Sequence, residues 1–395
     1  MTTPRQTLVS GLAVGAALLL AACSSSGSTA STTPSAAAPA SSSAAATDSA
    51  SAAPAAAGDA KSAKSAADVG GMDGLVAAAK KEGALNVIAL PPDWANYGAI
   101  ISGFTAKYGI KVNSAQPDGS SQDEVNAVKQ LKGTDRAPDV LDIGMAVALA
   151  NTDLFAPYQV ASWKDILDGQ KEPTGLWFQD YGGYMSIGYD SAKVPAPTSV
   201  ADLLKPAYKG KVALNGDPTK ANAALNGVIM ASVAQGGSLD DISKGVDFFK
   251  QMKAAGNFIP VQATTATVKN GTTQVVFDWD YLSAGAVKNV PTWKVFVPSN
   301  AIIGGYYAQA INKDAPHAAA ARLWEEYLYS DEGQNLWLKG GARPVRMDAM
   351  TKAGTIDATA AAALPKVDGT PVFPSQDQAT KAKTFLAANW AKAIG

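Results

Sequence analysis

Apolar and polar positions along the chain alternate between short apolar runs and amphipathic stretches. The pattern predicts a helix over residues 73–82, ending before Gly83, and a buried strand over the apolar run 85–90. The next helix carries Ile100, Ile101 and Phe104 on one face and ends before a second strand over 110–112. A strand, a helix and a strand at this spacing predict a parallel sheet with right-handed crossovers, and therefore an α/β fold.

Loops rich in polar or aromatic side chains follow the predicted strands. Further strands are predicted over residues 138–143, 211–214 and 273–277. Ligands of open parallel sheets bind beyond the carboxyl ends of the strands, so these loops are candidate walls of a cleft. The candidate residues in them are Trp94, Asn96, Tyr97, Gly144, Asp217, Trp279 and Asp280.

The N-terminus has the pattern of a lipoprotein signal peptide over residues 1–22. Arg5 gives a basic start, residues 8–20 form an apolar segment too short to span a bilayer, and the run Leu-Ala-Ala-Cys ends at Cys23. We expect lipid attachment and cleavage at Cys23, which would hold the protein on the extracytoplasmic face of the cell membrane. An ordinary secretory signal with a chance cysteine is the alternative.

Residues 23–67 are predicted to form a disordered tether between this anchor and the folded part. The segment is almost entirely Ser, Ala, Thr, Pro and Gly, which bury too little apolar surface to offset the entropy of ordering. Beyond it the sequence contains no further apolar run long enough to cross a bilayer. The anchor is therefore the expected contact with the membrane.

From residue 68 onward the composition is that of a globular protein. The formal net charge of the chain is -1 and no basic block occurs, which argues against a nucleic-acid partner. The single cysteine excludes an intramolecular disulfide, so a large apolar core must stabilise the exported domain. At more than 300 residues this part is expected to form two lobes.

Several segments together resemble the extracellular solute-binding proteins of ABC importers, and within them the spermidine/putrescine-binding group. They include Asp-Trp-Ala-Asn-Tyr at 93–97 and Ser-Ile-Gly-Tyr at 186–189. Segments 104–112, 203–212, 310–317 and 329–334 add to the likeness, which covers nearly all of residues 68–395.

The resemblance implies a two-lobed periplasmic-binding-protein fold of type II. Lobe 1 would take residues 68–179 and 301–395, and lobe 2 residues 180–300. Two crossovers near 180–184 and 298–300 would act as a hinge that closes over the solute. Tyr181 and Tyr184 lie near the first crossover. A monomer without cofactor, working with ABC permease subunits, is expected.

For the solute, the resemblance implies a polyamine or another amine cation. Trp94, Tyr97 and Trp279 match aromatic positions of the polyamine group, and Asp217 matches the start of its acidic loop. Cations bind aromatic faces and carboxylates, and Asp278 and Asp280 would add negative charge. The sequence departs from the group at 304–309, where the expected acid is missing and Tyr306 and Tyr307 stand instead.

Other ligands and functions remain open. Lys220 follows Asp217, and a helix starting there could bind a phosphonate or another small anion. Ferric iron is a third candidate because Tyr306 and Tyr307 are adjacent, although the loop at 278–281 has only one tyrosine. A sensor or adhesin that reuses the fold is a further alternative to transport.

We expect no enzymatic activity. The only histidine, His317, begins an Ala-rich helix, and the sequence contains no His-Glu-x-x-His motif, no zinc-spaced cysteines and no Gly-x-Ser-x-Gly nucleophile elbow.

The residues expected to contact the solute are Trp94, Asn96, Tyr97, Gly144, Tyr181, Tyr184, Asp217, Trp279, Asp280, Tyr306 and Tyr307.

Overall fold

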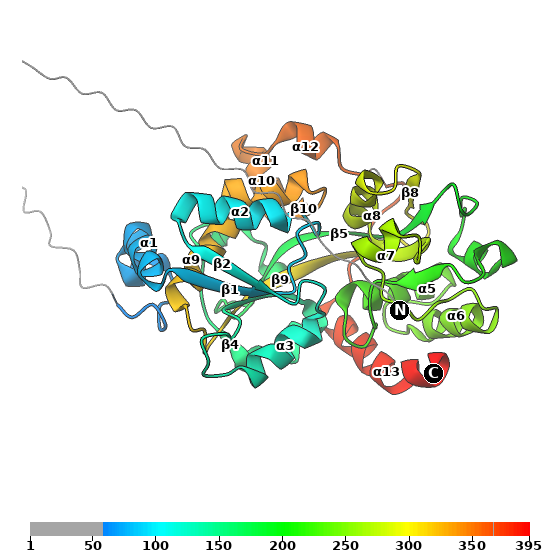
Figure 1. Cartoon of the computed structure of the whole chain (residues 1–395), viewed down its shortest axis with the longest axis horizontal. Helices are drawn as coiled ribbons and strands as arrows, with labels where there is room; N and C mark the ends of the chain where they lie inside the picture. The colour runs from blue at the N-terminus through cyan, green and yellow to red at the C-terminus, as the bar shows by residue number, and fades with distance from the viewer. Residues whose placement is uncertain (1–57, 366) are drawn as a thin grey trace, which may run out of the picture. The chain divides into compact units, whose positions relative to one another are not determined.

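The computed structural model describes residues 58–365 and 367–395 (Figure 1). The predicted signal peptide, the predicted lipidation residue Cys23 and the predicted linker up to residue 57 lie outside the described residues. No helix within the described ranges combines the length and the apolar run needed to cross a membrane.

The last ten residues of the predicted tether pack on the folded domain. Ala63 is buried, and the buried Arg322 guanidinium donates to the carbonyl oxygens of Lys61 and Ala63 at 2.9 and 2.8 Å. The short helix η1 (Ala66–Val69) follows. Composition alone does not predict that this segment is ordered, because Arg322 binds its backbone carbonyl groups, which every residue type has.

Parallel strands β1 (Ala84–Ile88) and β2 (Lys111–Ala115), joined by α2 (Tyr97–Tyr108), form the strand, helix, strand unit predicted from the sequence. Ile100 and Phe104 on α2 are fully buried, as their spacing of four residues requires for one helix face. The helices around this unit are α1 (Gly71–Glu82), α9 (Ala318–Leu328) and α10 (Asp331–Lys339).

The larger sheet is mixed, with antiparallel pairings predominating over the parallel ones expected. Its strand order is β3 (Val140–Gly144), β9 (Gly304–Asn312), β5 (Phe178–Asp190), β7 (Val275–Trp279) and β6 (Val212–Leu214). Only β6 and β7 pair in parallel along this path. Short strands β4 (Phe155–Ala156), β8 (Trp293–Phe296) and β10 (Arg343–Pro344) add to β9 and β5.

Strand β5 links the two lobes. Its first part, up to Tyr184, pairs with β9 of lobe 1, and its second part, from Met185, pairs with β7 of lobe 2. The change of partner falls at the end of the predicted crossover 180–184. In Figure 1, β5 and β9 run between the helices around β1 and those numbered α5 to α8. The two-lobed α/β fold predicted from the sequence is confirmed.

The helices of lobe 2 cover both faces of its sheet. They are α5 (Asn222–Ala234), α6 (Ser243–Ala254), α7 (Thr265–Lys269), α8 (Asp280–Gly285) and η7 (Ala286–Lys288).

Short helices and turns make up the rest of both lobes. They are α3 (Ser121–Gln130), α4 (Met145–Leu149), η2 (Thr152–Leu154), η3 (Trp163–Asp165), η4 (Asp168–Gln170), η5 (Val200–Leu204), η6 (Pro206–Tyr208), α11 (Met347–Ala353) and α12 (Ala358–Ala362).

The C-terminal helix α13 (Gln376–Ile394) packs against α6 of lobe 2 and also against α4 of lobe 1, although the sequence analysis assigned residues 301–395 to lobe 1 alone. Its Trp390 ring lies 5.5 Å from Phe249 on α6, and its other end contacts α4. The chain therefore passes between the lobes a third time, just before α13. There Val372 pairs with Ile303, and the Phe373 ring covers Gly304.

Candidate functional site

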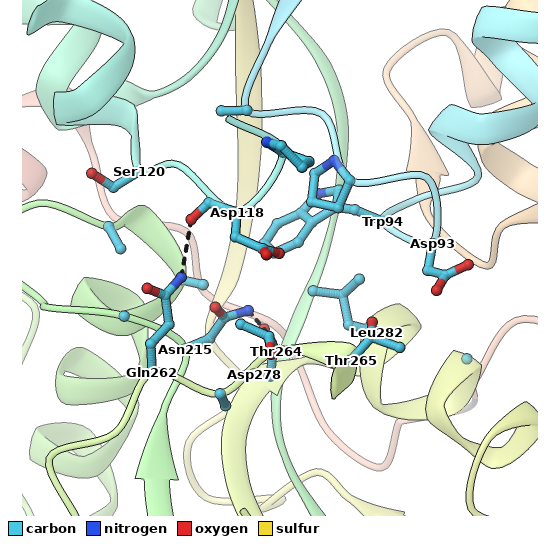
Figure 2. A pocket seen from close by; sticks show the side chains of 18 of the residues that line it. Asp93, Trp94, Asp118, Ser120, Asn215, Gln262, Thr264, Thr265, Asp278 and Leu282 are labelled. Carbon is cyan, nitrogen blue, oxygen red and sulfur yellow. Dashed lines mark hydrogen bonds between the residues drawn. The ribbon is translucent and has the colours of Figure 1, made fainter. Parts of the chain in front are cut away.

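A cavity of about 470 Å³ lies between loops of the two lobes (Figure 2). One wall comes from the loops that follow β1 and β2 in lobe 1, and the other from the loops that follow β6 and β7 in lobe 2. The Gln262 amide donates to the carbonyl oxygen of Asp118 at 3.2 Å and so joins the two walls. In Figure 2, Trp94 projects from the first wall, with Asp278, Thr264 and Leu282 across from it.

The lobe 1 wall is built from strained loops. Ala89, Ala95, Asn96 and Gln116 are the non-glycine residues of the described ranges with left-handed backbone, at φ between 42° and 68°. All four lie in the loops that follow β1 and β2. Such strain costs about 1–3 kcal/mol per residue and concentrates at ligand sites. Here it presents the half-buried Trp94 side chain to the cavity.

Asp142 on β3 is a buried carboxylate that lines the cavity. Its Oδ2 accepts a 2.7 Å hydrogen bond from the Tyr181 hydroxyl, and its Oδ1 has no hydrogen-bond partner among the described residues. Burial raises the pKa of Asp142 to about 6, against the lowering effect of the Tyr181 and Tyr97 hydroxyls.

More carboxyl groups are buried around Asp142, and one of them, Glu124, also lines the cavity. Glu124 accepts from the backbone N–H of Asp142 at 3.0 Å, and Asp180 accepts from the Gln309 amide at 2.8 Å. Burial and then the neighbouring Asp142 charge raise the pKa values of Glu124, Asp180 and Glu325. These neighbours of Asp142 are therefore acidic, and none of them supplies a positive charge.

Asp278 supplies a second buried carboxylate, from lobe 2. Strand alternation places Val275, Phe277 and Trp279 in the main core and Val276 and Asp278 on the face that lines the cavity. The Asn215 amide donates to Oδ2 at 2.9 Å, and the Trp279 backbone N–H donates to Oδ1 at 2.8 Å. Burial raises the pKa of Asp278 to about 7 in spite of these donors.

Neither Asp142 nor Asp278 has a cationic partner within the described part of the chain. Two other buried acids do, since Asp280 pairs with Arg343 at 2.8 Å and Asp139 accepts from His317 at 2.9 Å, whereas Glu124, Asp180 and Glu325 form no ion pair among the described residues. Burial without a cation therefore favours the neutral form of Asp142 and Asp278, and pairing with a positive charge would favour their ionised form.

Tyrosine hydroxyls lie between the two carboxylates. Burial raises the pKa of Tyr281, and the nearby charges of Tyr307, Asp278 and Asp142 raise it further. The Tyr281 hydroxyl has no hydrogen-bond partner among the described residues. The Trp279 indole donates to Tyr307 Oη at 3.4 Å. Trp94 meets the rings of Tyr281 and Tyr307 edge to face, at 6.4 and 5.7 Å. The cavity therefore has an aromatic interior flanked by acids.

Four of the predicted contact residues line the cavity, namely Trp94, Asn96, Asp217 and Tyr307. Two of them also serve their own loops. The Asn96 side chain donates to the Leu336 carbonyl oxygen at 2.9 Å, and the exposed Asp217 accepts from the backbone N–H and the hydroxyl of Thr219 at 2.9 and 2.8 Å.

Three predicted aromatic residues lie behind the walls and do not line the cavity. Tyr97, Tyr181 and Trp279 are fully buried. Tyr97 is the first residue of α2 and accepts from Gln309 at 3.2 Å, while Tyr181 supports Trp94. Tyr181 and Trp279 affect the cavity indirectly, through their hydrogen bonds with the cavity residues Trp94 and Tyr307.

The remaining predicted residues lie elsewhere. Gly144 sits against Asn222, outside the cavity. Asp280 is fully buried against Arg343, whose guanidinium stacks 4.1 Å from the Tyr184 ring. Tyr306 packs 6.1 Å from Phe373 at the third passage between the lobes.

The sequence analysis missed Asp142, Asn215 and Tyr281. For Asp142 a signal exists, because it is the lone acid in a strand whose neighbours Leu141 and Ile143 face an apolar cluster. No sequence signal identifies Tyr281, because the position of its ring depends on where α8 begins.

Ligands other than cations find fewer partners. Among the described residues, no group of three or more His, Cys, Asp and Glu side chains is arranged to hold a metal ion. Lys220 lines the cavity but lies 3.6 Å from Asp217. The N-terminus of α5 also lines it, and no side chain caps that helix.

Solved structures with the same fold carry different solutes. AfuA from Actinobacillus pleuropneumoniae, with fructose-6-phosphate bound, is 16% identical with TM-score 0.60 over 79% of this chain and 98% of that one. Iron-bound HitA from Pseudomonas aeruginosa is 19% identical with TM-score 0.57 over 79% and 99%. A putative spermidine/putrescine ABC transporter protein from Listeria monocytogenes is 13% identical with TM-score 0.58 over 78% and 99%. At these identities the likeness shows the fold alone.

The family is established by sequence. No curated protein matches the chain. Residues 138–381, more than half of its length, match the model of a family described as bacterial extracellular solute-binding protein. This match spans the central sheet, the whole of lobe 2 and the start of α13. The chain therefore belongs to the bacterial extracellular solute-binding proteins.

Proposed function

We propose that this solute-binding protein of ABC transport captures a small organic cation, with amines and polyamines as the chemical class. The observation that carries the proposal is the pair of buried carboxylates, Asp142 in one lobe and Asp278 in the other, without a cationic partner in the described part of the chain. A cation held between them contacts both lobes and favours the closed state.

The energetics support a cation. A charge-assisted hydrogen bond to a carboxylate contributes about 1.5–3 kcal/mol, and a cation over an aromatic face about 0.5–2 kcal/mol. One bond at Asp142, one at Asp278 and a stacked Trp94 therefore suffice for micromolar affinity, about 8 kcal/mol, when burial of the solute adds to them.

The rim of the cavity also carries mainly negative charge. Asp93, Asp118 and Asp217 are exposed at its edge, and Lys288 is the exposed lysine there besides the paired Lys220. Such a rim attracts cations and raises their association rate at low ionic strength.

A small anion is the second candidate. The uncapped N-terminus of the 13-residue helix α5 favours it, since free backbone N–H groups and the helix dipole bind phosphate or carboxylate. The buried acids oppose it, because an anion beside Asp142 or Asp278 meets a like charge.

The proposal includes the lipid anchor predicted at Cys23 and delivery to permease subunits by a monomer. A flexible tether keeps the domain close to its permease and raises its local concentration there. A sensor that reuses the fold would bind the same solute without a permease.

The test is a binding screen on the purified protein. Putrescine, spermidine, choline and simple alkylamines are compared with methylphosphonate, inorganic phosphate and ferric citrate by thermal shift and calorimetry. We expect shifts with amines only, and at least a tenfold loss of affinity in Asp142→Asn and Asp278→Asn. Asp240→Asn, an exposed acid of lobe 2 that does not line the cavity, is the matched control. Binding of anions alone would overturn the proposal.

A further inference from the structure

The strand that carries Asp278 also carries an apolar side chain into the same cavity. Val276 and Asp278 lie on one face of β7, two residues and therefore about 7 Å apart. A group bound at Asp278 thus has an apolar surface directly beside it, on the lobe 2 side of the cavity.

This surface extends over several elements, which together form an apolar annex. Its six residues line the cavity and come from the sheet, from α7 and α8 and from the segments beside them: Ala263, Val268, Val276, Leu282, Ala286 and Trp293. Ala263, Val276 and Trp293 belong to one buried cluster, against which Val268 and Ala286 pack. Five of the six therefore form a continuous wall, and Leu282, which packs against the main core, lines the cavity with them.

The sheet makes room for this wall through a glycine. Gly188 on β5 pairs with Val276, and a Cβ atom at Gly188 would lie 2.6 Å from Trp293 Nε1 and 2.8 Å from Ser283 Oγ. A side chain there would displace the indole. The absence of a side chain at Gly188 lets Trp293 lie across the sheet and complete the annex.

The annex has no charge to offer a second cationic group. None of its six residues is acidic, and the exposed Lys288, two residues after Ala286, lines the same cavity. An ammonium group at that end would lose hydration against apolar walls without gaining a carboxylate partner. A hydrocarbon arm at the same place gains free energy by leaving water.

We infer that the solute is an amphiphilic cation, whose charged nitrogen binds at Asp278 and whose uncharged apolar arm fills the annex. The inference rests on the proposed function and sharpens it, because it distinguishes alkyl or aryl amines from linear diamines. Specificity among cations would then come from burial of the arm in lobe 2.

A homologous series of n-alkylamines tests the annex on the purified protein. Each buried methylene should tighten binding about three- to fourfold until the arm outgrows the annex. A diamine of equal length should bind more weakly than the alkylamine, because its second ammonium group meets the annex. Dissociation constants from calorimetry give both results.

Filling the annex provides a second measurement. Ala286→Leu should remove the gain with chain length while methylamine keeps its affinity. Ala254→Leu, at an exposed position of α6, is the matched control. Equal affinity along the series, or diamines binding best, would overturn the annex but leave the cation proposal standing. Failure of every amine to bind would overturn the proposed function instead.

Discussion

The Trp94 indole donates a 2.7 Å hydrogen bond to the Tyr181 hydroxyl, which donates in turn to Asp142 at 2.7 Å. Trp94 lies in the first-lobe loop that follows β1, whereas Tyr181 lies on β5, the strand that links the lobes. The buried Tyr181 therefore orients the cavity aromatic and supplies the donor to the cavity carboxylate. Its role is positioning.

Replacing Tyr181 with Phe should weaken cation binding about 10- to 100-fold at pH 7, because the variant leaves the indole N–H and the carboxylate without their partner. The pKa of Asp142 should also rise, since the hydroxyl lowers it. Calorimetry at pH 7 and pH 8.5 measures both effects.

The defect in Tyr181→Phe should shrink at the higher pH, where Asp142 ionises even without its donor. Tyr184→Phe is the matched control, because Tyr184 lies on the same strand and does not line the cavity. Equal affinity in Tyr181→Phe and the native protein would show that the hydrogen bonds do not position the site.

Cation affinity should rise as pH increases from about 5 to 8. A cation binds the ionised carboxylates, and the pKa values of Asp142 and Asp278 are about 6 and about 7, so protons leave as the solute enters. Calorimetry at pH 6.5 in two buffers with different ionisation enthalpies counts these protons. Asp142→Asn should release fewer. A binding heat that is independent of the buffer would contradict the prediction.

The stability of the free protein should respond to pH in the opposite sense. The native pKa of Asp278, about 7, lies above its ordinary value of 3.8, so the native state retains the proton that the unfolded chain loses. Stability from this group is full below about pH 4 and is lost as pH rises through about 7. Urea denaturation should show Asp278→Asn to be more stable than the native protein at pH 8.

At pH 4 the same Asp278→Asn substitution should be nearly neutral, since both side chains are then uncharged. Asp240→Asn should follow the native curve at both pH values. A variant that is equally destabilised at pH 4 and pH 8 would mean that the carboxylate makes a structural contact that an amide cannot replace.

Periodic patterns allowed the first lobe to be predicted, because α2 buries Ile100 and Phe104 four residues apart whatever it packs on. Contacts across long separations could not be predicted. Trp94 and Tyr97 are both aromatic residues of one loop, yet α2 begins at Tyr97 and buries it against Tyr181 and Trp337, while Trp94 reaches the cavity. The assignment of residues 301–395 to lobe 1 likewise could not foresee that α13 packs against α6 of lobe 2.

The buried ion pair of Arg343 and Asp280 should contribute strongly to stability. Arg343→Met leaves the fully buried Asp280 carboxylate without its partner, which should cost about 3–5 kcal/mol in urea denaturation. The double variant Asp280→Asn, Arg343→Met should recover most of this loss.

An exposed pair provides the comparison. Lys205→Met breaks the 2.6 Å contact with Asp202 at the surface and should change stability by less than about 1 kcal/mol. If Arg343→Met were as mild as Lys205→Met, the Asp280 carboxyl would have to be neutral in the folded protein.

Helix α13 should stabilise lobe 2, although it follows a long stretch of lobe 1 in sequence. Trp390 is buried with its ring 5.5 Å from Phe249 and 6.2 Å from Phe258, both in lobe 2. Trp390→Ala should therefore cost about 3 kcal/mol and expose amides of α6 to hydrogen exchange, while those of β1 and α2 remain protected. Lys392→Ala, exposed in the last turn of the same helix, should do neither. Equal loss of protection in both lobes would mean that the third passage joins them into one cooperative unit, so that a solute bound in lobe 2 also stabilises lobe 1.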